Sequence, residues 1–433
     1  METEIEKRTL RRISWRIVPF IMLLYFIAYL DRVNIGFAAL TMKHDLGFTA
    51  SILGMGAGIF FWGYFLFEVP SNIALHRFGA RLWIARVMVS WGIISGTMAF
   101  VQGATSFYIM RFLLGAAEAG FFPGIILYLS YWFPARHRAS VTALFMAAAP
   151  ISTALGSPIS AALLDMHGFL GLVGWQWMFI LEAIPALLLG VVVFFYMTDK
   201  PEQAKWLKDD ERAWLVQAMQ KEQADKAAQA HHSVFAGLAN PRVLALALIY
   251  FGTSAGLYTL GIWAPQIIKE LGVSSMTVGY LNAIPPIVSV LAMVLWSRHS
   301  DRSGERTWHV VLACCAAAIG LVVAAGASSI VGLIAALTLV NIGISCAKPP
   351  LWSMPTMFLS GAAAATGIAT INSIGNLGGF AGPAMIGWVK DSTGSYQGGL
   401  YFVAGLLMLS AVLTLLLARS GPSQPQAQPV AAH

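Results

Sequence analysis

A few charged side chains of this 433-residue sequence stand inside long apolar stretches, namely Asp31, Arg32, Arg111, Glu118 and Lys348. A charge at the centre of a bilayer costs roughly 2.5–3.5 kcal/mol on insertion scales, so a function is expected for each of them. Arginine binds a carboxylate through two parallel hydrogen bonds and stays charged at any working pH. A buried carboxyl group beside an arginine is suited to bind and release a proton, since desolvation and the cation act on it in opposite directions.

The spacing of these residues predicts how they face one another. Arg111 and Glu118 are seven residues apart, so on a helix they share one face, about 10 Å apart along the axis. Asp31 and Arg32 are adjacent and point about 100° apart. These four residues could form an internal salt-bridge set. Buried ion pairs stabilise a protein poorly compared with apolar packing, so a substrate and proton site is favoured. Glu68 and Glu182 stand nearer the ends of their apolar stretches and are interpreted as structural.

The elements that must position these residues are membrane spans. Hydrophobic residues make up 58% of the chain and charged residues 11%, against about 25% charged in soluble domains. Three cysteines in apolar runs argue against a disulfide framework. The sequence predicts an all-α polytopic membrane protein with twelve transmembrane helices. These spans are expected at 17–40, 52–75, 82–101, 107–132, 140–164, 177–197, 243–268, 276–297, 308–327, 330–358, 363–388 and 398–418.

The basic residues predict the orientation of the chain. With the N-terminus in the cytoplasm, 21 of the 27 Lys and Arg residues fall inside, three outside and three within spans. This bias places both termini in the cytoplasm and explains the net charge of +7 without a nucleic acid partner. A polar stretch at about 198–241 follows the sixth span. Its Trp206, Trp214 and Leu215 could form one face of a helix at the membrane surface, or the stretch could be a solvated linker.

An internal repeat divides the chain into two halves. An offset of 225 residues aligns Tyr25-Phe26 with Tyr250-Phe251, and it aligns Arg77, Gly79, Arg81 and Trp83 with Arg302, Gly304, Arg306 and Trp308. The expected organisation is a six-helix bundle at 1–198, a cytoplasmic linker at 199–241, a second six-helix bundle at 242–419 and a disordered tail at 420–433. The same offset aligns Asp31-Arg32 with Gly256-Leu257 in the second copy, so the shared fold does not require this charged pair.

Two cytoplasmic loops and several span motifs carry a family resemblance. Asn72–Arg81 and Ser297–Arg306 resemble the G-x-x-x-D-R-x-G-R-R loop of the major facilitator superfamily, although His76 replaces the usual acid that Asp301 retains. Leu30–Phe37, Arg111–Gly120 and Asn372–Gly379 look like the anion:cation symporter family, and most like its permeases for 4-hydroxyphenylacetate, tartrate and phthalate. The residues expected to control conformation in these loops are Arg77, Gly79, Arg81, Asp301, Arg302 and Gly304.

The resemblance implies roles for the charges in the spans. Arg32 and Arg111 would bind the substrate anion, Asp31 and Glu118 would carry protons, and Tyr64 would donate a hydrogen bond to substrate. Second-half groups expected to close the site are Asn372, Asn376, Trp352 and Ser353, with packing between helices as the alternative. Lys348 is a further candidate cation.

The function expected from these features is proton-coupled uptake of a small organic carboxylate by alternating access, in a monomer of the inner membrane. Sodium coupling and anion exchange are the alternatives. No cluster of His, Cys or acidic residues at one depth indicates an integral-membrane enzyme, a metal site or a cofactor.

Overall fold

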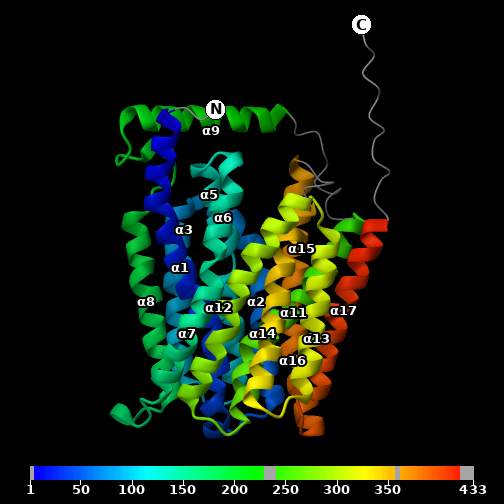
Figure 1. Cartoon of the computed structure of the whole chain (residues 1–433). Helices are drawn as coiled ribbons and strands as arrows, with labels where there is room; N and C mark the ends of the chain where they lie inside the picture. Colours follow the sequence, from blue (N-terminus) through cyan, green and yellow to red (C-terminus); the bar gives the residue numbers. More distant parts are fainter. Residues whose placement is uncertain (1–3, 229–239, 356–360, 420–433) are drawn as a thin grey trace.

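The computed structural model describes residues 4–228, 240–355 and 361–419, and these residues form helices and connecting segments without a strand. Eleven helical segments in the described part are long and apolar enough to cross a membrane. The remaining predicted span, 363–388, which is the eleventh in chain order, is formed by two shorter helices, α15 and α16, that are interrupted at Leu377. The predicted fold class is therefore confirmed, with α1 beginning and α17 ending at the same end of two packed bundles (Figure 1). The tail predicted at 420–433 lies outside the described residues.

The first bundle contains α1 to α8, and two of its spans are each built from two helices. Its helices are α1 (Glu4–Asp45), α2 (Ala50–Phe78), α3 (Ala80–Thr97), α4 (Ala104–Glu118), α5 (Phe121–Trp132), α6 (Ala135–Met146), α7 (Ala148–Leu164) and α8 (Gly174–Tyr196). Pro150 has no N–H to donate to Met146, which explains why α6 ends there. Gly120, at φ 85°, separates α4 from α5, and Ser71 donates to the carbonyl oxygen of Ala119 at 2.6 Å. This break leaves Glu118 as the last residue of α4.

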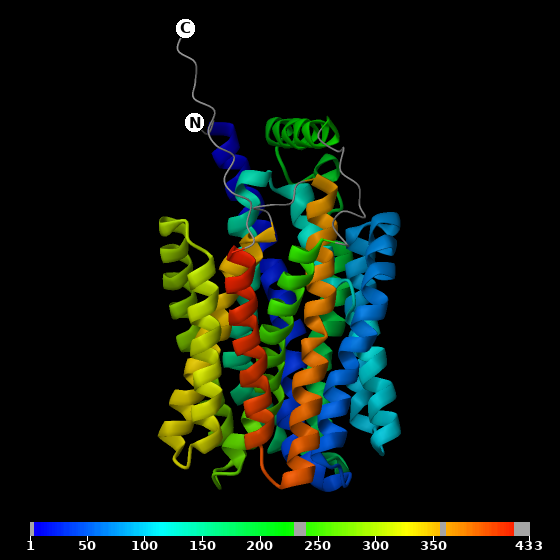
Figure 2. The ribbon, with the colours of Figure 1, turned by 90° about the vertical axis from the view of Figure 1, so that its right-hand side faces the viewer.

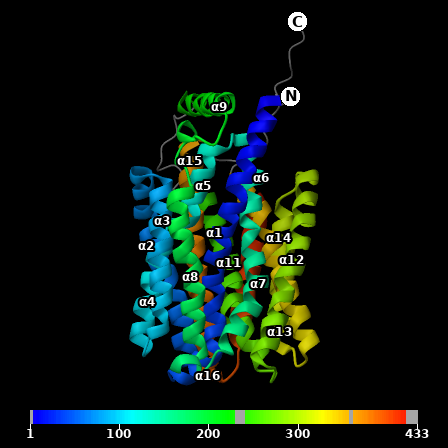
Figure 3. The same ribbon diagram turned by 90° about the vertical axis from the view of Figure 1, so that its left-hand side faces the viewer.

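The second bundle contains α11 to α17. Its helices are α11 (Pro241–Lys269), α12 (Ser275–Ser303), α13 (Thr307–Gly326), α14 (Ile330–Ser353), α15 (Gly361–Asn376), α16 (Gly378–Thr393) and α17 (Gln397–Arg419). Short 3₁₀ helices lie at 98–100, 169–171 and 201–203. Figure 2 shows α16, in orange, alongside α2 of the first bundle, and Figure 3 shows α1, α7 and α8 from the opposite side.

The polar stretch after the sixth span packs apolar side chains against the protein. Its helix α9 (Asp209–Ala228) lies across the cytoplasmic end of the first bundle (Figure 1). Leu215 is buried, and Trp206, just before α9, stacks on Trp132 with ring centroids 5.3 Å apart. The apolar side of this stretch faces the protein because the cytoplasmic end of the bundle offers it an aromatic surface. Residues 229–239 lie outside the described part.

Glycines allow the two bundles to pack closely at their external ends. A Cβ atom added at Gly36 of α1 would overlap the carbonyl oxygen of Gly261 of α11, its partner in the repeat. Gln266 also donates to the carbonyl oxygen of Gly36 at 2.9 Å. A residue meets its own repeat copy only near the axis that relates the halves, so this contact marks that axis.

The repeat continues into contacts further from the axis. Gly54 lies against Pro383 of α16, and its copy Gly279 lies against Pro158 of α7. Pro158 and Pro383 are themselves 225 residues apart. Nearby, Asn282 donates to the Ser157 hydroxyl at 2.9 Å. These contacts, which we call the external seal, close the route between the bundles from the outside in this conformation.

Candidate functional site

An ion pair between α1 and α4 forms the centre of the candidate site. Arg32 donates to one oxygen of Glu118 from Nε at 2.7 Å and also from a terminal guanidinium nitrogen. The two side chains are 15% and 2% exposed. Arg32 also donates to the hydroxyl of Tyr258, on α11, at 3.3 Å. The pair therefore lies where the first bundle meets the second.

Arg111 lies close by but has different partners. Its guanidinium donates to the backbone carbonyl oxygens of Gly56 and Ala57 on α2, at 3.1 and 3.4 Å. The guanidinium carbons of Arg111 and Arg32 lie 5.0 and 5.8 Å from the centroid of the Phe60 ring. Arg111 thus supplies positive charge near the ion pair while its hydrogen bonds hold two helices together.

Asp31 does not join the Arg32–Glu118 pair. It accepts hydrogen bonds from the Trp91 indole, from the Ser95 hydroxyl at 2.8 Å and from the Asn34 amide at 3.2 Å. Trp91 and Ser95 belong to α3, so Asp31 turns away from its neighbour Arg32 towards the interior of the first bundle. The 100° between adjacent residues on a helix explains the divergence.

Glu182 is buried inside the first bundle. It is buried at 2% exposure on α8, and Ser160 donates to its Oε1 at 2.7 Å. Its Oε2 has no hydrogen-bond partner in the described part of the chain. Glu182 also interacts electrostatically with Asp31. Asp31 and Glu182 therefore form a second acidic cluster inside the first bundle, and the structural role of Glu182 stays a prediction.

Tyrosines and a lysine surround Arg32, and the sequence prediction included only Tyr64 and, as an open candidate, Lys348. The Arg32 guanidinium carbon lies 5.2 Å from the ring centroid of Tyr29 and 5.8 Å from that of Tyr64. Lys348, partly buried on α14, is close enough to interact electrostatically with Tyr29 and Arg32. No salt bridge joins Lys348 to another described residue. The second bundle thus places a cation opposite the ion pair.

The polar residues of α15 bind an acid of the first bundle. Asn372 donates to Oε1 of Glu68 at 2.7 Å, and Ser373 donates to Oε2 at 2.9 Å. Asn376 in turn donates to the Asn372 side chain at 3.2 Å. Glu68 is buried between the two bundles. These bonds connect the bundles on the cytoplasmic side of the site, while a substrate contact for Asn372 and Asn376 stays a prediction.

Trp352 and Ser353 end α14. Trp352 packs edge-on against Tyr250 with ring centroids 5.0 Å apart, and the Ser353 hydroxyl donates to the carbonyl oxygen of Pro350 at 2.7 Å. Trp352 and Tyr250 extend the aromatic lining into the second bundle. Tyr250 could have been singled out, because it is the repeat copy of Tyr25.

The residues predicted to control conformation lie in two cytoplasmic turns. Gly79 and Gly304 both have positive φ, 89° and 67°. Asp199, which follows α8, accepts a hydrogen bond from the Arg81 backbone N–H at 2.8 Å, so it supplies an acid where His76 does not.

In the second turn Asp301 forms a salt bridge with Arg306 at 2.7 Å. Arg77 lies 5.6 Å from the ring of Phe78, and Arg302 is exposed. Both acids bind within their own half.

Metal chemistry has no support in the described residues, where no group of three or more His, Cys, Asp or Glu side chains could hold a metal ion. The site instead offers cations, one ion-paired carboxylate, tyrosine hydroxyls and amides. Such groups can bind a small polar anion.

Comparison with known proteins identifies the family. The family model described as Major Facilitator Superfamily matches residues 21–383 and 246–432. A protein from Agrobacterium vitis named "Putative tartrate transporter" is 72% identical over 98% of this chain and 97% of its own length. The inner membrane transport protein RhmT of Escherichia coli is 38% identical over 96% of this chain and 97% of its own length. The chain belongs to the Major Facilitator Superfamily and is a multi-pass membrane transporter.

Solved structures share the fold. A bacterial homologue of the human lysosomal transporter Spinster superposes with a TM-score of 0.76 at 14% identity, covering 94% of this chain and 97% of the other. The xylose transporter XylE from Escherichia coli, in an inward-open conformation, gives a TM-score of 0.75 at 14% identity, covering 95% and 97%.

Proposed function

We propose that this chain is a proton-coupled symporter that takes up a small dicarboxylate of the tartrate type by alternating access. The observation that carries the proposal is the Arg32–Glu118 pair, which is buried and lies between the two bundles. A substrate carboxylate competes with Glu118 for the same guanidinium. Binding a proton to Glu118 removes this competition, and that exchange couples proton binding to substrate binding.

The charges near Arg32 suit a dianion. Arg32, Arg111 and Lys348 contribute three positive charges, and Glu118 contributes one negative charge. When Glu118 carries the proton that admits the substrate it is neutral, so the three cations face a substrate with two carboxylates. Tyr29, Tyr64 and Tyr258 stand around Arg32 and would bind hydroxyl groups on the substrate carbon chain. The name of the relative at 72% identity supports tartrate as the first substrate to test.

The transport cycle follows from the contacts between the bundles. In the conformation described here the external seal is closed, and Glu68 on the cytoplasmic side is bonded to Asn372 and Ser373. Opening to the outside requires the seal to separate at Gly36–Gly261 while the cytoplasmic contacts stay closed. Glu118 then binds a proton, Arg32 binds the substrate, and the bundles rock to release both inside.

Uptake by the purified full-length protein in proteoliposomes tests the proposal. Labelled tartrate should accumulate when the outside is acidic and should not respond to a sodium gradient. Phthalate, 4-hydroxyphenylacetate and a sugar acid are added as competitors to define the substrate class. Accumulation driven by a sodium gradient alone would indicate sodium coupling, and accumulation that requires an anion inside the vesicles would indicate anion exchange. Either result would overturn proton symport.

Two further features belong to the proposal. The protein acts in the cytoplasmic (inner) membrane, which agrees with the name of the relative RhmT. It works as a monomer, because the candidate site is complete within one chain. Static light scattering of the detergent-solubilised protein, corrected for the detergent, measures the oligomeric state.

A further inference from the structure

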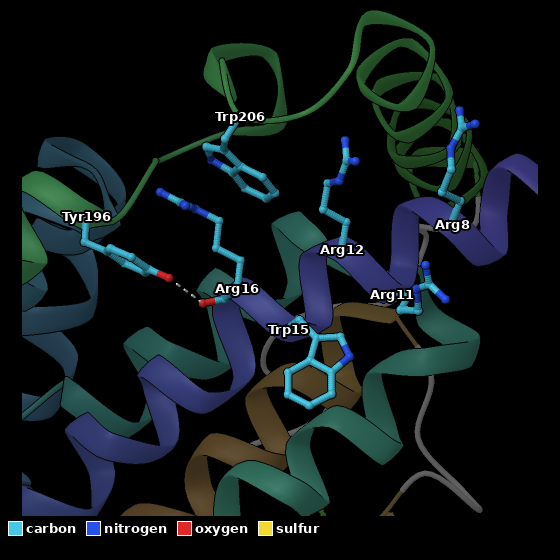
Figure 4. Close-up of a pocket in the computed structure, with 7 residues that line it drawn as sticks. All are labelled: Arg8, Arg11, Arg12, Trp15, Arg16, Tyr196 and Trp206. Carbon is cyan, nitrogen blue, oxygen red and sulfur yellow. Dashed lines mark hydrogen bonds between the residues drawn. The ribbon is translucent and has the colours of Figure 1, made fainter.

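A basic cavity opens at the cytoplasmic end of α1, apart from the transport site. It has a volume of about 400 Å³ and is lined by Arg8, Arg11, Arg12, Trp15, Arg16, Tyr196 and Trp206 (Figure 4). The lining residues come from α1, from the end of α8 and from the segment before α9. Arg8, Arg12 and Arg16 recur at intervals of four residues and therefore form one stripe along α1. Arg11 and Trp15 form the neighbouring stripe.

Arg16 is held in place by aromatic rings. Its guanidinium carbon lies 4.4 Å from the ring centroid of Tyr196 and 4.9 Å from that of Trp206. The Tyr196 hydroxyl donates to the backbone carbonyl oxygen of Arg16 at 3.1 Å, a bond that Figure 4 shows. Stacking uses the faces of a guanidinium and leaves its N–H edges available for an anion.

The helix α9 neutralises only part of this charge. Arg8 pairs with Asp210 and Glu211, and Arg12 pairs with Glu211 at 2.6 Å. Burial alone would raise the pKa of Asp210, but hydrogen bonds from the Glu211 amide and from Arg8 hold it below its ordinary value. Arg11 and Arg16 have no ion pair with a carboxylate in the described part of the chain. Four arginines against two carboxylates leave a charge of +2.

The position of the cavity identifies the source of the anion. Trp15 is 77% exposed and stands directly before the predicted first span, at the depth where tryptophans anchor proteins in the headgroup region. The cavity lies on the cytoplasmic side, where anionic lipids attract basic segments close to the membrane. An exposed indole beside arginines fits a molecule with a phosphate and an apolar part.

We propose that the basic cavity binds the phosphate headgroup of an anionic phospholipid of the inner leaflet. Arg16 and Arg12 hold the phosphate, Arg11 adds charge, and Trp15 packs on the glycerol and the first part of the acyl chains. The bound lipid lies against α1, α8 and the segment that leads into α9, so it fastens the cytoplasmic end of the first bundle to the membrane.

Binding is measured with the full chain in detergent by thermophoresis. The ligands are short-chain phosphatidylglycerol, short-chain phosphatidylcholine and inorganic phosphate, each over a range of salt concentrations. Phosphatidylglycerol should bind more tightly than phosphatidylcholine, and its affinity should fall as salt rises. The double variant Arg11→Gln/Arg16→Gln should lose about thirtyfold in affinity, from roughly 1 kcal/mol for each charge near an anionic surface.

Two variants separate the cavity from general charge and from misfolding. Arg298→Gln removes an exposed cytoplasmic arginine of the second bundle and should leave the affinity unchanged. Arg16→Lys keeps the charge but loses the stacked guanidinium, so its loss of affinity should be smaller than that of the double variant. Equal losses in Arg298→Gln and the double variant, or wild-type affinity in the double variant, would overturn the proposal. So would inorganic phosphate that binds as tightly as phosphatidylglycerol, since the site would then serve a free anion.

Discussion

Arg32 donates two hydrogen bonds to a single oxygen of Glu118, while Asp31, the preceding residue, bonds to Trp91 and Ser95 on another helix. The carboxyl groups of Asp31 and Glu118, which the sequence predicted to form one proton site, therefore have separate environments. In the proposed function, Glu118 competes with the substrate anion for Arg32. Asp31 contacts the interior of the first bundle instead.

Replacing Arg32 with lysine should weaken substrate binding. The substitution keeps the charge but removes the planar pair of donors that a carboxylate uses. A hydrogen bond to a charged group contributes about 1.5–3 kcal/mol, so KM for tartrate uptake should rise roughly tenfold or more. Arg298→Lys serves as the control on an exposed residue. An unchanged KM in Arg32→Lys would mean that Arg32 does not bind the substrate.

Glu182 should accept glutamine but not alanine. Glutamine retains a carbonyl oxygen that can accept the Ser160 hydroxyl, whereas alanine leaves this buried hydroxyl and the neighbouring volume unfilled. Loss of a buried partner costs about 1–3 kcal/mol, so Glu182→Ala should unfold at a clearly lower temperature than Glu182→Gln. Thermal unfolding followed by tryptophan fluorescence measures both. Equal stability of the two variants would show that the Ser160 bond does not matter.

The twelve spans, their orientation and the two halves could be predicted because apolar length, basic residues and repeat spacing record them directly. The 100° between Asp31 and Arg32 follows from helix geometry, but their partners could not be predicted, because the rotation of α1 about its axis is set by tertiary contacts with α3. The spacing of Pro158 and Pro383 was visible in the sequence. Only the contacts with Gly279 and Gly54 show that this spacing belongs to the external seal.

The partners of the predicted site residues depend on how the helices pack. Lys348 faces Arg32 from the other bundle, and Glu68 binds Asn372 over a sequence separation of 304 residues. Hydropathy gives the depth of such residues only approximately and gives no information on which helix they face. The docking of α9 was missed for the same reason, since its apolar residues fit lipid and protein equally well.

Replacing Gly36 with valine should destabilise the external seal. A side chain at Gly36 would overlap the backbone of Gly261, so the conformation closed to the outside should become less populated. In a background where the native cysteines Cys314, Cys315 and Cys346 are serine, a cysteine at the buried Ser157 reports on opening. An impermeant maleimide added outside should label it several times faster in Gly36→Val.

The matched control for this experiment is Gly405→Val, because no atom lies within 4 Å of a Cβ added at Gly405. Its labelling rate should equal that of the parent. If Gly36→Val and Gly405→Val label equally slowly, the Gly36–Gly261 contact is not part of the gate.

The turn between α12 and α13 should show a pH dependence that comes from Glu305. Burial alone would raise the pKa of Glu305, but hydrogen bonds from the Trp308 and His309 amides and from the His309 ring lower it. A lowered pKa in the folded state means that the contribution is complete above the ordinary glutamate value of about 4.3 and is lost as the pH falls through the folded value. The melting temperature of Glu305→Gln should therefore lie slightly below that of the wild type at neutral pH, and the difference should vanish in acid. A difference that grows in acid would contradict this assignment.

Glu118→Gln in proteoliposomes tests the proposed coupling most directly. Glutamine keeps the shape of Glu118 but cannot release a proton, and it leaves Arg32 available to the substrate. The variant should exchange labelled for unlabelled tartrate across the membrane, yet it should no longer accumulate tartrate when the outside is made acidic. Accumulation driven by the pH gradient at the wild-type level would contradict the account, because proton binding at Glu118 would then have no part in transport.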